Sequence, residues 1–234
     1  MSEYHCDICN DEEYIFFTDE QGNSWSRPCS CKKIRRTLSN AEKSGLGGLL
    51  NEYTFERFCT DLPFQKELYD KARKYLSGNE NKWFSVFGKT GAGKTMICTA
   101  ICRELLEQGH EVRFVNWVED SRRLKSLVNG QEYDALIEPL KNCEVLYIDD
   151  FFKADNDTPP TNADIKLANE LLNHRYNKAR KADEICKTII SSERALAQII
   201  HYDEAIAGRI AEMSDGYITL LQDDAINFRL KKYI

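Results

Sequence analysis

Short apolar runs alternate along the chain with longer segments in which apolar residues recur every three or four positions. The run at 83–87 and the run that begins at Val145 are dense enough for strands buried on both faces of a parallel sheet. The segment at 111–116 is predicted as a strand from the alternation of its apolar and polar positions. The predicted strands are 83–87, 111–116, 145–150, 188–193 and 217–221.

Between these strands the apolar spacing is that of helices. After Thr95, the residues Ile97, Ile101 and Leu105 share one helical face, and Gly109 is a suitable stop. A second stripe follows residue 161 and includes Ile165, Ala168, Leu172, Tyr176 and Ala179. The predicted helices are 65–76, the segment from Thr95 to Gly109, 118–142 with a break at Asn129-Gly130, the segment after 161, and 203–213.

The N-terminal part of the chain follows neither pattern for long. Residues 14–18 and 24–27 suit two short strands joined by a turn at 20–23. Ser44 to Gly48 is the clearest linker signal in the chain. We therefore expect a small module with a basic connector at 1–43, a linker at 44–52 and a large domain at 53–234.

Composition sets bounds on this scheme. A chain of 234 residues with 42% hydrophobic content can bury a full core. The net charge of −6 gives no general attraction to nucleic acid, so any such contact needs a local basic patch. No apolar stretch reaches membrane-spanning length and the N-terminus lacks a signal-peptide core, so we expect a cytoplasmic protein with no membrane partner.

The most specific motif follows the apolar run 83–87. Its pattern, Gly-x4-Gly-Lys-Thr, is the phosphate-binding P-loop. The glycines let backbone N–H groups point at phosphate oxygens, Lys94 brings a positive charge to the β- and γ-phosphates, and the Thr95 hydroxyl can bind Mg²⁺. A helix N-terminus after Thr95 would face the phosphates. The predicted nucleotide-binding residues of the loop are Gly88, Lys89, Thr90, Gly91, Ala92, Gly93, Lys94 and Thr95.

Two carboxylates end the predicted strand 145–150. In parallel sheets, ligands bind beyond the carboxyl ends of the strands, which is where Asp149 and Asp150 fall. We expect Asp149 to hold Mg²⁺ through water and Asp150 to polarise the attacking water. The next strand ends in Ser191-Ser192-Glu193, a position suited to sensing the γ-phosphate.

Four of the nine cysteines lie in two close pairs near the N-terminus. Cys6 and Cys9, with Cys29 and Cys31, fit a tetrahedral thiolate site for zinc, and metal binding would supply folding energy to a module with almost no core. The alternatives are a redox Cys-x-x-Cys pair and ordinary buried cysteines. A redox pair needs no second pair, and burial does not explain the polar surroundings, so zinc is the preferred interpretation. The other five cysteines lie in apolar or helical contexts typical of small core residues.

Two groups of basic residues are candidates for nucleic acid. Trp117 with Arg122, Arg123 and Lys125 could hold a single strand of DNA by base stacking and phosphate contact. The alternative is an exposed helix face with Trp117 in the core. For the basic residues within 32–36, a solvated face is at least as plausible as a contact with nucleic acid or a partner.

Four motifs, taken in order, resemble those of the AAA+ ATPases of the DnaC/IstB type over residues 50–234. They are the P-loop, the Ile-Asp-Asp strand end, the Ile-Ile-Ser-Ser-Glu strand and Gly208-Arg209-Ile210. The paired cysteines further resemble those of phage and prophage helicase loaders. The resemblance implies an α/β fold: an αβα sandwich with a five-stranded parallel sheet, in the order 5-1-4-3-2, and no full C-terminal lid. Tyr53 to Phe58 would form the adenine-side wall.

The resemblance also implies a function, which is loading a hexameric replicative helicase onto single-stranded DNA with ATP, Mg²⁺ and Zn²⁺ as cofactors. Subunits would assemble when ATP binds, with Arg209 as an arginine finger for a neighbour and Arg229 as a second sensor. Many family members have glutamate at the position of Asp150, and Ser192 or Glu193 would replace the usual sensor asparagine. Two alternatives remain: a transposase helper of the IstB kind, and an ATP-binding adaptor with little hydrolysis.

Overall fold

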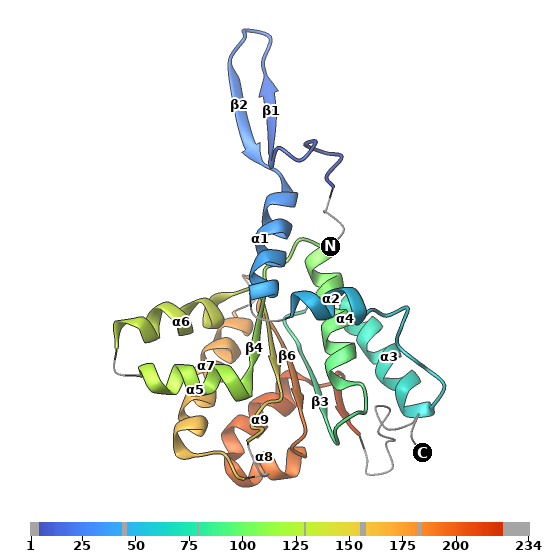
Figure 1. Cartoon of the computed structure of the whole chain (residues 1–234), viewed down its shortest axis with the longest axis vertical. Coiled ribbons are helices and arrows are strands. Elements are labelled where there is room, and N and C mark those ends of the chain that lie inside the picture. Colours follow the sequence, from blue (N-terminus) through green and yellow to red (C-terminus); the bar gives the residue numbers. More distant parts are fainter. Residues whose placement is uncertain are drawn as a thin grey trace.

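The fold is that of a computed structural model, which describes residues 5–43, 46–78, 80–128, 130–154, 158–181 and 184–221. Its strands pair into two sheets, an N-terminal hairpin and a five-stranded parallel sheet (Figure 1). The strands are β1 (Tyr14–Thr18), β2 (Ser24–Pro28), β3 (Trp83–Phe87), β4 (Val112–Asn116), β5 (Val145–Asp149), β6 (Lys187–Ser192) and β7 (Ile218–Leu220). The helices are α1 (Ser30–Lys43), α2 (Gly47–Glu52), α3 (Pro63–Ser77), α4 (Lys94–Glu107), α5 (Trp117–Leu127), α6 (Gln131–Asn142), α7 (Asn162–Ala179), α8 (Leu196–Tyr202) and α9 (Glu204–Met213).

The parallel sheet has the order β4-β5-β6-β3-β7. Numbered from the first strand of the large domain, this is 5-1-4-3-2, so the predicted α/β architecture and strand order are confirmed. Strand alternation divides the core in two. In β5, Val145 and Tyr147 face the cluster around α4, whereas Leu146 and Ile148 face the cluster around α7. Both faces are therefore covered, as the continuous apolar runs predict.

The N-terminal hairpin pairs in antiparallel register, with Phe16 opposite Ser26. Its turn is closed by the Asp19 carboxylate, which accepts hydrogen bonds from the backbone N–H groups of Gln21 (3.0 Å) and Asn23 (2.8 Å). Figure 1 shows this hairpin projecting away from the parallel sheet, with α1 lying between the two. All five residues of β2 are exposed, so the hairpin adds little to either core cluster.

Helices α1 and α2 were not predicted. Ile34, Thr37 and Ala41 of α1 are buried, and Ala41 belongs to the same core cluster as α4. The predicted linker 44–52 contains α2, whose Leu50 is buried, with Leu46 buried just before it. Ser44 and Gly45 lie outside the described residues. The chain from residue 30 onward thus packs with the large domain, because helical spacing places apolar residues between the basic ones.

Candidate nucleotide-binding site

The predicted P-loop connects β3 to the N-terminus of α4. Gly93, the N-cap of α4, has φ of 88°, a left-handed conformation that favours glycine. Gly88 has φ of 141°, and a Cβ there would lie 2.7 Å from the Leu221 Cβ and 2.8 Å from the Leu221 carbonyl oxygen. Glycine at position 88 therefore allows Leu221, the residue directly after β7, to lie beside the loop.

Lys94 lies in the centre of the loop. Its Nζ donates hydrogen bonds to the carbonyl oxygens of Gly88 (2.6 Å) and Lys89 (2.7 Å). Burial lowers the pKa of Lys94, although the charges of Glu193, Asp150 and Asp149 oppose that shift. A lysine so placed is a charged donor in a confined space, as a polyphosphate site requires.

Thr95 and Asp149 are brought together across the loop. The Thr95 hydroxyl lies 3.3 and 3.4 Å from the two Asp149 carboxylate oxygens. The Tyr147 hydroxyl donates to Asp149 Oδ1 (2.7 Å), and the Ser191 hydroxyl donates to the same oxygen. These bonds fix the orientation of a buried carboxylate beside a hydroxyl. This oxygen pair fits Mg²⁺, which prefers hard oxygen ligands.

Asp150 lies at the start of a tight turn. Asp150 and Phe152 have positive φ values of 53° and 59°, and the turn is closed by a 2.9 Å hydrogen bond from the Lys153 N–H to the Asp150 carbonyl. The turn brings Lys153 Nζ to 3.0 Å from Asp150 Oδ2 and 3.1 Å from Glu193 Oε1. Burial raises the pKa of Asp150, although the Lys153 ammonium counteracts the shift. The expected water-polarising carboxylate is therefore held in an ion pair.

Trp117 is a core residue, as the second of the two interpretations expected, so it does not stack on a base. It is 2% exposed and packs edge-on against Phe151 and Phe152, with ring centroids 4.9 and 5.5 Å away. Phe151 and Phe152 stack on each other in the turn between Asp150 and Lys153. Trp117 thus supports the turn that carries the charged groups, because an aromatic pair in that turn needs an apolar partner.

The three basic DNA candidates differ in their surroundings. The ammonium of Lys125 pairs with Asp164 at the start of α7 and donates a hydrogen bond to it. Arg122 and Arg123 are exposed on α5. Their role in DNA binding stays a prediction.

A cavity of about 510 Å³ unites these groups. Its phosphate end holds the P-loop, both aspartates, Lys153 and Glu193. Its other end is lined by side chains from α2 and from the segment before α3. Among them are Tyr53, Arg57 and Phe58, which belong to the predicted adenine-side wall at 53–58. The lining residues are Leu49, Tyr53, Arg57, Phe58, Cys59, Gln65, Thr90, Gly91, Gly93, Lys94, Thr95, Met96, Asp149, Asp150, Lys153 and Glu193. A phosphate end joined to a partly apolar end fits a nucleotide.

Of the two predicted sensor residues, the structure brings only Glu193 to the cavity. The Ser192 hydroxyl donates to the Phe151 carbonyl oxygen (2.6 Å) and accepts from the Arg194 N–H (3.0 Å), so it is committed to the backbone. Its neighbour Ser191 contacts Asp149 instead. Adjacent residues of a strand point to opposite faces, which separates the two serines.

Of the two predicted arginines, the structure describes only Arg209, and this residue does not line the cavity. Arg209 lies half-buried on α9, where its Nη1 donates to Asn169 Oδ1 (3.4 Å) and its guanidinium lies 5.9 Å from the centre of the Tyr176 ring. It thus faces α7 and not the cavity of its own chain. Arg229 lies outside the described residues.

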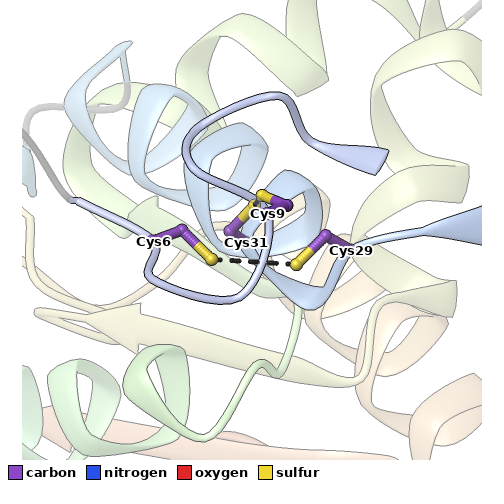
Figure 2. A group of neighbouring side chains, drawn as sticks. All are labelled: Cys6, Cys9, Cys29 and Cys31. Atoms are coloured by element: carbon purple, nitrogen blue, oxygen red, sulfur yellow. Dashed lines mark hydrogen bonds between the residues drawn. The ribbon is translucent and has the colours of Figure 1, made fainter. Parts of the chain in front are cut away.

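The four N-terminal cysteines form one buried cluster (Figure 2). The sulfur atoms of Cys6 and Cys29 are 3.7 Å apart, those of Cys9 and Cys31 are 3.3 Å apart, and all four lie within 4.8 Å of one another. Tetrahedral zinc with Zn–S bonds of about 2.3 Å places its sulfurs about 3.8 Å apart. The donor set and its spacing therefore fit Zn²⁺. A hydrogen bond from the Cys31 N–H lowers the pKa of Cys29 to about 7, whereas burial raises the pKa of Cys9 and of Cys31.

The basic stretch at 32–36 is occupied by contacts within the protein. Lys32 donates to the Tyr14 hydroxyl, Lys33 pairs with Glu144, and Arg35 pairs with Asp11. Arg36 lies 3.9 Å from Glu111. These contacts join α1 to the hairpin on one side and to the parallel sheet on the other, which favours the structural interpretation of these charges.

Several site residues were missed from the sequence. Tyr147 and Ser191 hold Asp149, and Lys153 pairs with Asp150 and Glu193. Tyr147 carries a detectable signal, because it lies two residues before Asp149 on the same face of β5. Lys153 carries none, because its position depends on the two left-handed residues of the turn.

The fold and the site have clear relatives. Residues 64–195 match the family described as Novel STAND NTPase 3 (nSTAND3). Over 96% of its length the chain is 26% identical to YqaM of Bacillus subtilis (strain 168), covering 75% of that protein. It is 29% identical to the replicative helicase loader DnaC of Escherichia coli (strain K12), over 59% of each chain.

A crystal structure of the DnaC helicase loader superposes with a TM-score of 0.61 at 20% identity, covering 73% of this chain and 97% of that one. That likeness shows the fold, which is the AAA+ fold of P-loop nucleotide-binding relatives. No helix in the described ranges is long and apolar enough to cross a membrane. The chain belongs to the nSTAND3 family of NTPases, and its homologues include the DnaC-type helicase loaders.

Proposed function

We propose that this protein is an ATP-dependent loader that helps to place a hexameric replicative helicase onto single-stranded DNA. The observation that carries the proposal is the 29% identity to DnaC over 59% of the chain. That similarity supports a loader role, and the site supports the use of ATP.

Within the cavity, each residue has a proposed task. The P-loop N–H groups and Lys94 bind the β- and γ-phosphates, while Thr95 and Asp149 hold Mg²⁺. Bound Mg²⁺ would neutralise phosphate charge. Asp150 polarises the attacking water and accepts its proton, and Glu193 monitors the γ-phosphate.

We further propose that ATP-bound subunits assemble, and the position of Arg209 supports this proposal. A guanidinium that faces away from its own cavity is available to a neighbouring subunit after rotation of its side chain, and its bond to Asn169 at 3.4 Å is long. An arginine finger supplied in this way makes hydrolysis depend on the assembled state.

The N-terminal hairpin is the proposed contact for the helicase. Phe16 and Trp25 are 66% and 54% exposed, and Ile8 in the loop between the first two cysteines is 67% exposed. Exposed aromatic side chains on a projecting arm are typical of a protein-binding surface. In this proposal Zn²⁺ bound by the four cysteines keeps the arm folded.

The test is helicase loading by the full-length chain. We expect the protein to capture the hexameric helicase in the presence of ATP and to increase the amount of helicase bound to circular single-stranded DNA. Lys94→Ala should abolish the increase, since triphosphate binding loses its central charge. Phe16→Ser combined with Trp25→Ser should reduce capture of the helicase. Ile200→Ser is the matched control, because Ile200 is a similarly exposed hydrophobic residue (50%) that lies on α8 and not on the hairpin. Capture that survives the hairpin substitutions would move the contact elsewhere.

One observation favours an ATP-binding adaptor with little hydrolysis as a second candidate. Asp150 is one methylene shorter than the glutamate common in relatives, and Lys153 already pairs with it. Measurement of ATP turnover with and without single-stranded DNA separates the two functions. A loader that uses hydrolysis turns ATP over faster with DNA and helicase present, whereas an adaptor does not.

A further inference from the structure

Lys153 is the one basic residue of the cavity, within the described chain, that joins two carboxylates. Its Nζ lies 3.0 Å from Asp150 and 3.1 Å from Glu193. Glu193 also accepts a hydrogen bond from the Thr90 side chain in the P-loop. A chain of polar contacts therefore runs from the end of β5, through Lys153, to the loop that binds phosphate.

The charges at this end of the cavity are unevenly matched. Among the described residues at this end, two lysines, Lys94 and Lys153, face three carboxylates, those of Asp149, Asp150 and Glu193. The positive charge of Lys153 is close enough to Lys94 to help lower the pKa of that residue. The two ammonium groups therefore share one electrostatic environment, into which the terminal phosphate of ATP would enter.

The backbone fixes the base of the lysine and leaves its end adjustable. Phe151 and Phe152 are fully buried, and the Phe151 N–H donates to the Ser191 carbonyl oxygen (2.9 Å). The Lys153 side chain is 38% exposed, so its ammonium can move within the cavity while its Cα stays in place. An ammonium has three donors, and two of them are used by the carboxylates.

We propose that Lys153 is a γ-phosphate-binding and positioning residue that acts within its own subunit. Without triphosphate its ammonium holds Asp150 and Glu193. With ATP bound it pairs with the terminal phosphate, and Asp150 is then free to polarise water. The inference rests on the proposed function, in which this cavity binds ATP.

The transfer follows from the strengths of the two partners. A terminal phosphate carries more charge than a single carboxylate and offers three acceptor oxygens, so it competes well for the lysine. ADP lacks that phosphate and leaves the lysine on its carboxylates. Lys153 would thereby link the presence of the γ-phosphate to the release of Asp150 from its ion pair.

The experiment compares the affinities of the full-length protein for Mg·AMP-PNP and Mg·ADP by calorimetry. In Lys153→Gln we expect the preference for AMP-PNP over ADP to fall on the order of tenfold or more, because a charge-assisted contact to the terminal phosphate is lost. Lys153→Arg should restore much of the preference. Lys166→Gln is the matched control, since Lys166 is exposed on α7 and outside the cavity. An unchanged preference in Lys153→Gln overturns the inference.

Asp150→Asn gives an independent readout. This substitution removes one of the two carboxylates that hold Lys153, so the preference for AMP-PNP over ADP should rise. A preference that stays the same or falls would contradict the proposal even if Lys153→Gln failed to fold. Failure of the parent protein to bind either nucleotide would instead refute the proposed function, so the two failures are distinguishable.

Discussion

Removal of zinc should unfold the N-terminal hairpin and leave the nucleotide-binding domain folded. The four cysteines form a cluster of their own, supported by one partly buried hydrophobic residue, Ile15. Hydrogen bonds also assist the cluster, among them those from the Cys29 N–H to the Glu13 carbonyl oxygen and from the Cys6 N–H to the Asp11 carboxylate. Such bonds contribute about 1 kcal/mol each. Structural zinc contributes about 10–16 kcal/mol, so nothing else in the module can replace it.

The assay uses the position of the tryptophans. Trp25 stacks on Phe17 in the hairpin, whereas Trp83 and Trp117 are buried in the large domain. A zinc chelator should therefore change the fluorescence of the parent protein and have little effect on Trp25→Phe. Affinity for ADP should be retained, because the cavity lies in the other domain. We expect close to one zinc per chain in the parent.

The control separates the metal site from the other cysteines. Cys29→Ser should lose the zinc and the chelator response, whereas Cys59→Ser, at an exposed cysteine outside the cluster, should keep one zinc per chain. Protein prepared without chelators that contained no metal would refute the reasoning. So would a hairpin that kept its fluorescence and its protection from proteases after the metal was removed.

Three further predictions concern the large domain. Lys94→Ala should weaken ATP binding, whereas Asp150→Asn should bind ATP and lose turnover. If Asp150→Asn and the parent protein turned ATP over at the same rate, another residue would activate the water. Arg209→Ala should bind ATP normally and lose ATP turnover in the assembly. Mixing this variant with Lys94→Ala should recover part of the activity. Full turnover of Arg209→Ala alone would exclude Arg209 as an arginine finger. Trp117→Ala should lower the free energy of unfolding in urea by about 3–5 kcal/mol, as expected for truncation of a buried aromatic. A stable Trp117→Ala that lost only DNA binding would restore the stacking hypothesis.

The sheet and the phosphate end of the cavity were predictable because their signals are local. The P-loop spacing and the acidic end of β5 each lie within a few residues, and the buried strands have dense apolar runs. The one-residue difference between Ser191 and Ser192 shows the limit of such reasoning. A shift of one position in a strand moves a side chain to the other face, and polar residues at both positions give no sign of the register.

Long-range packing accounts for the features that could not be predicted. The sequence around Trp117 does not distinguish an indole that stacks on a base from one that packs edge-on against Phe151 and Phe152, which are distant in the chain. The glycines near residue 46 suggest a linker, yet Leu46 and Leu50 are buried against the large domain. The ion pairs of Lys153 likewise depend on groups from two different strand ends.

The helix α1 has a consequence for how the projecting hairpin and the nucleotide site are joined. Cys31 lies within α1, so the cluster of four cysteines is fixed to a helix that is itself part of the large domain. With 14 residues, α1 is about 21 Å long, and it is a rigid helical connection and not a flexible linker. Lys33 of α1 pairs with Glu144, which lies directly before β5, and Asp149 is at the opposite end of that strand. Force applied to the hairpin would therefore reach the Asp149 carboxylate through one helix, one ion pair and one five-residue strand.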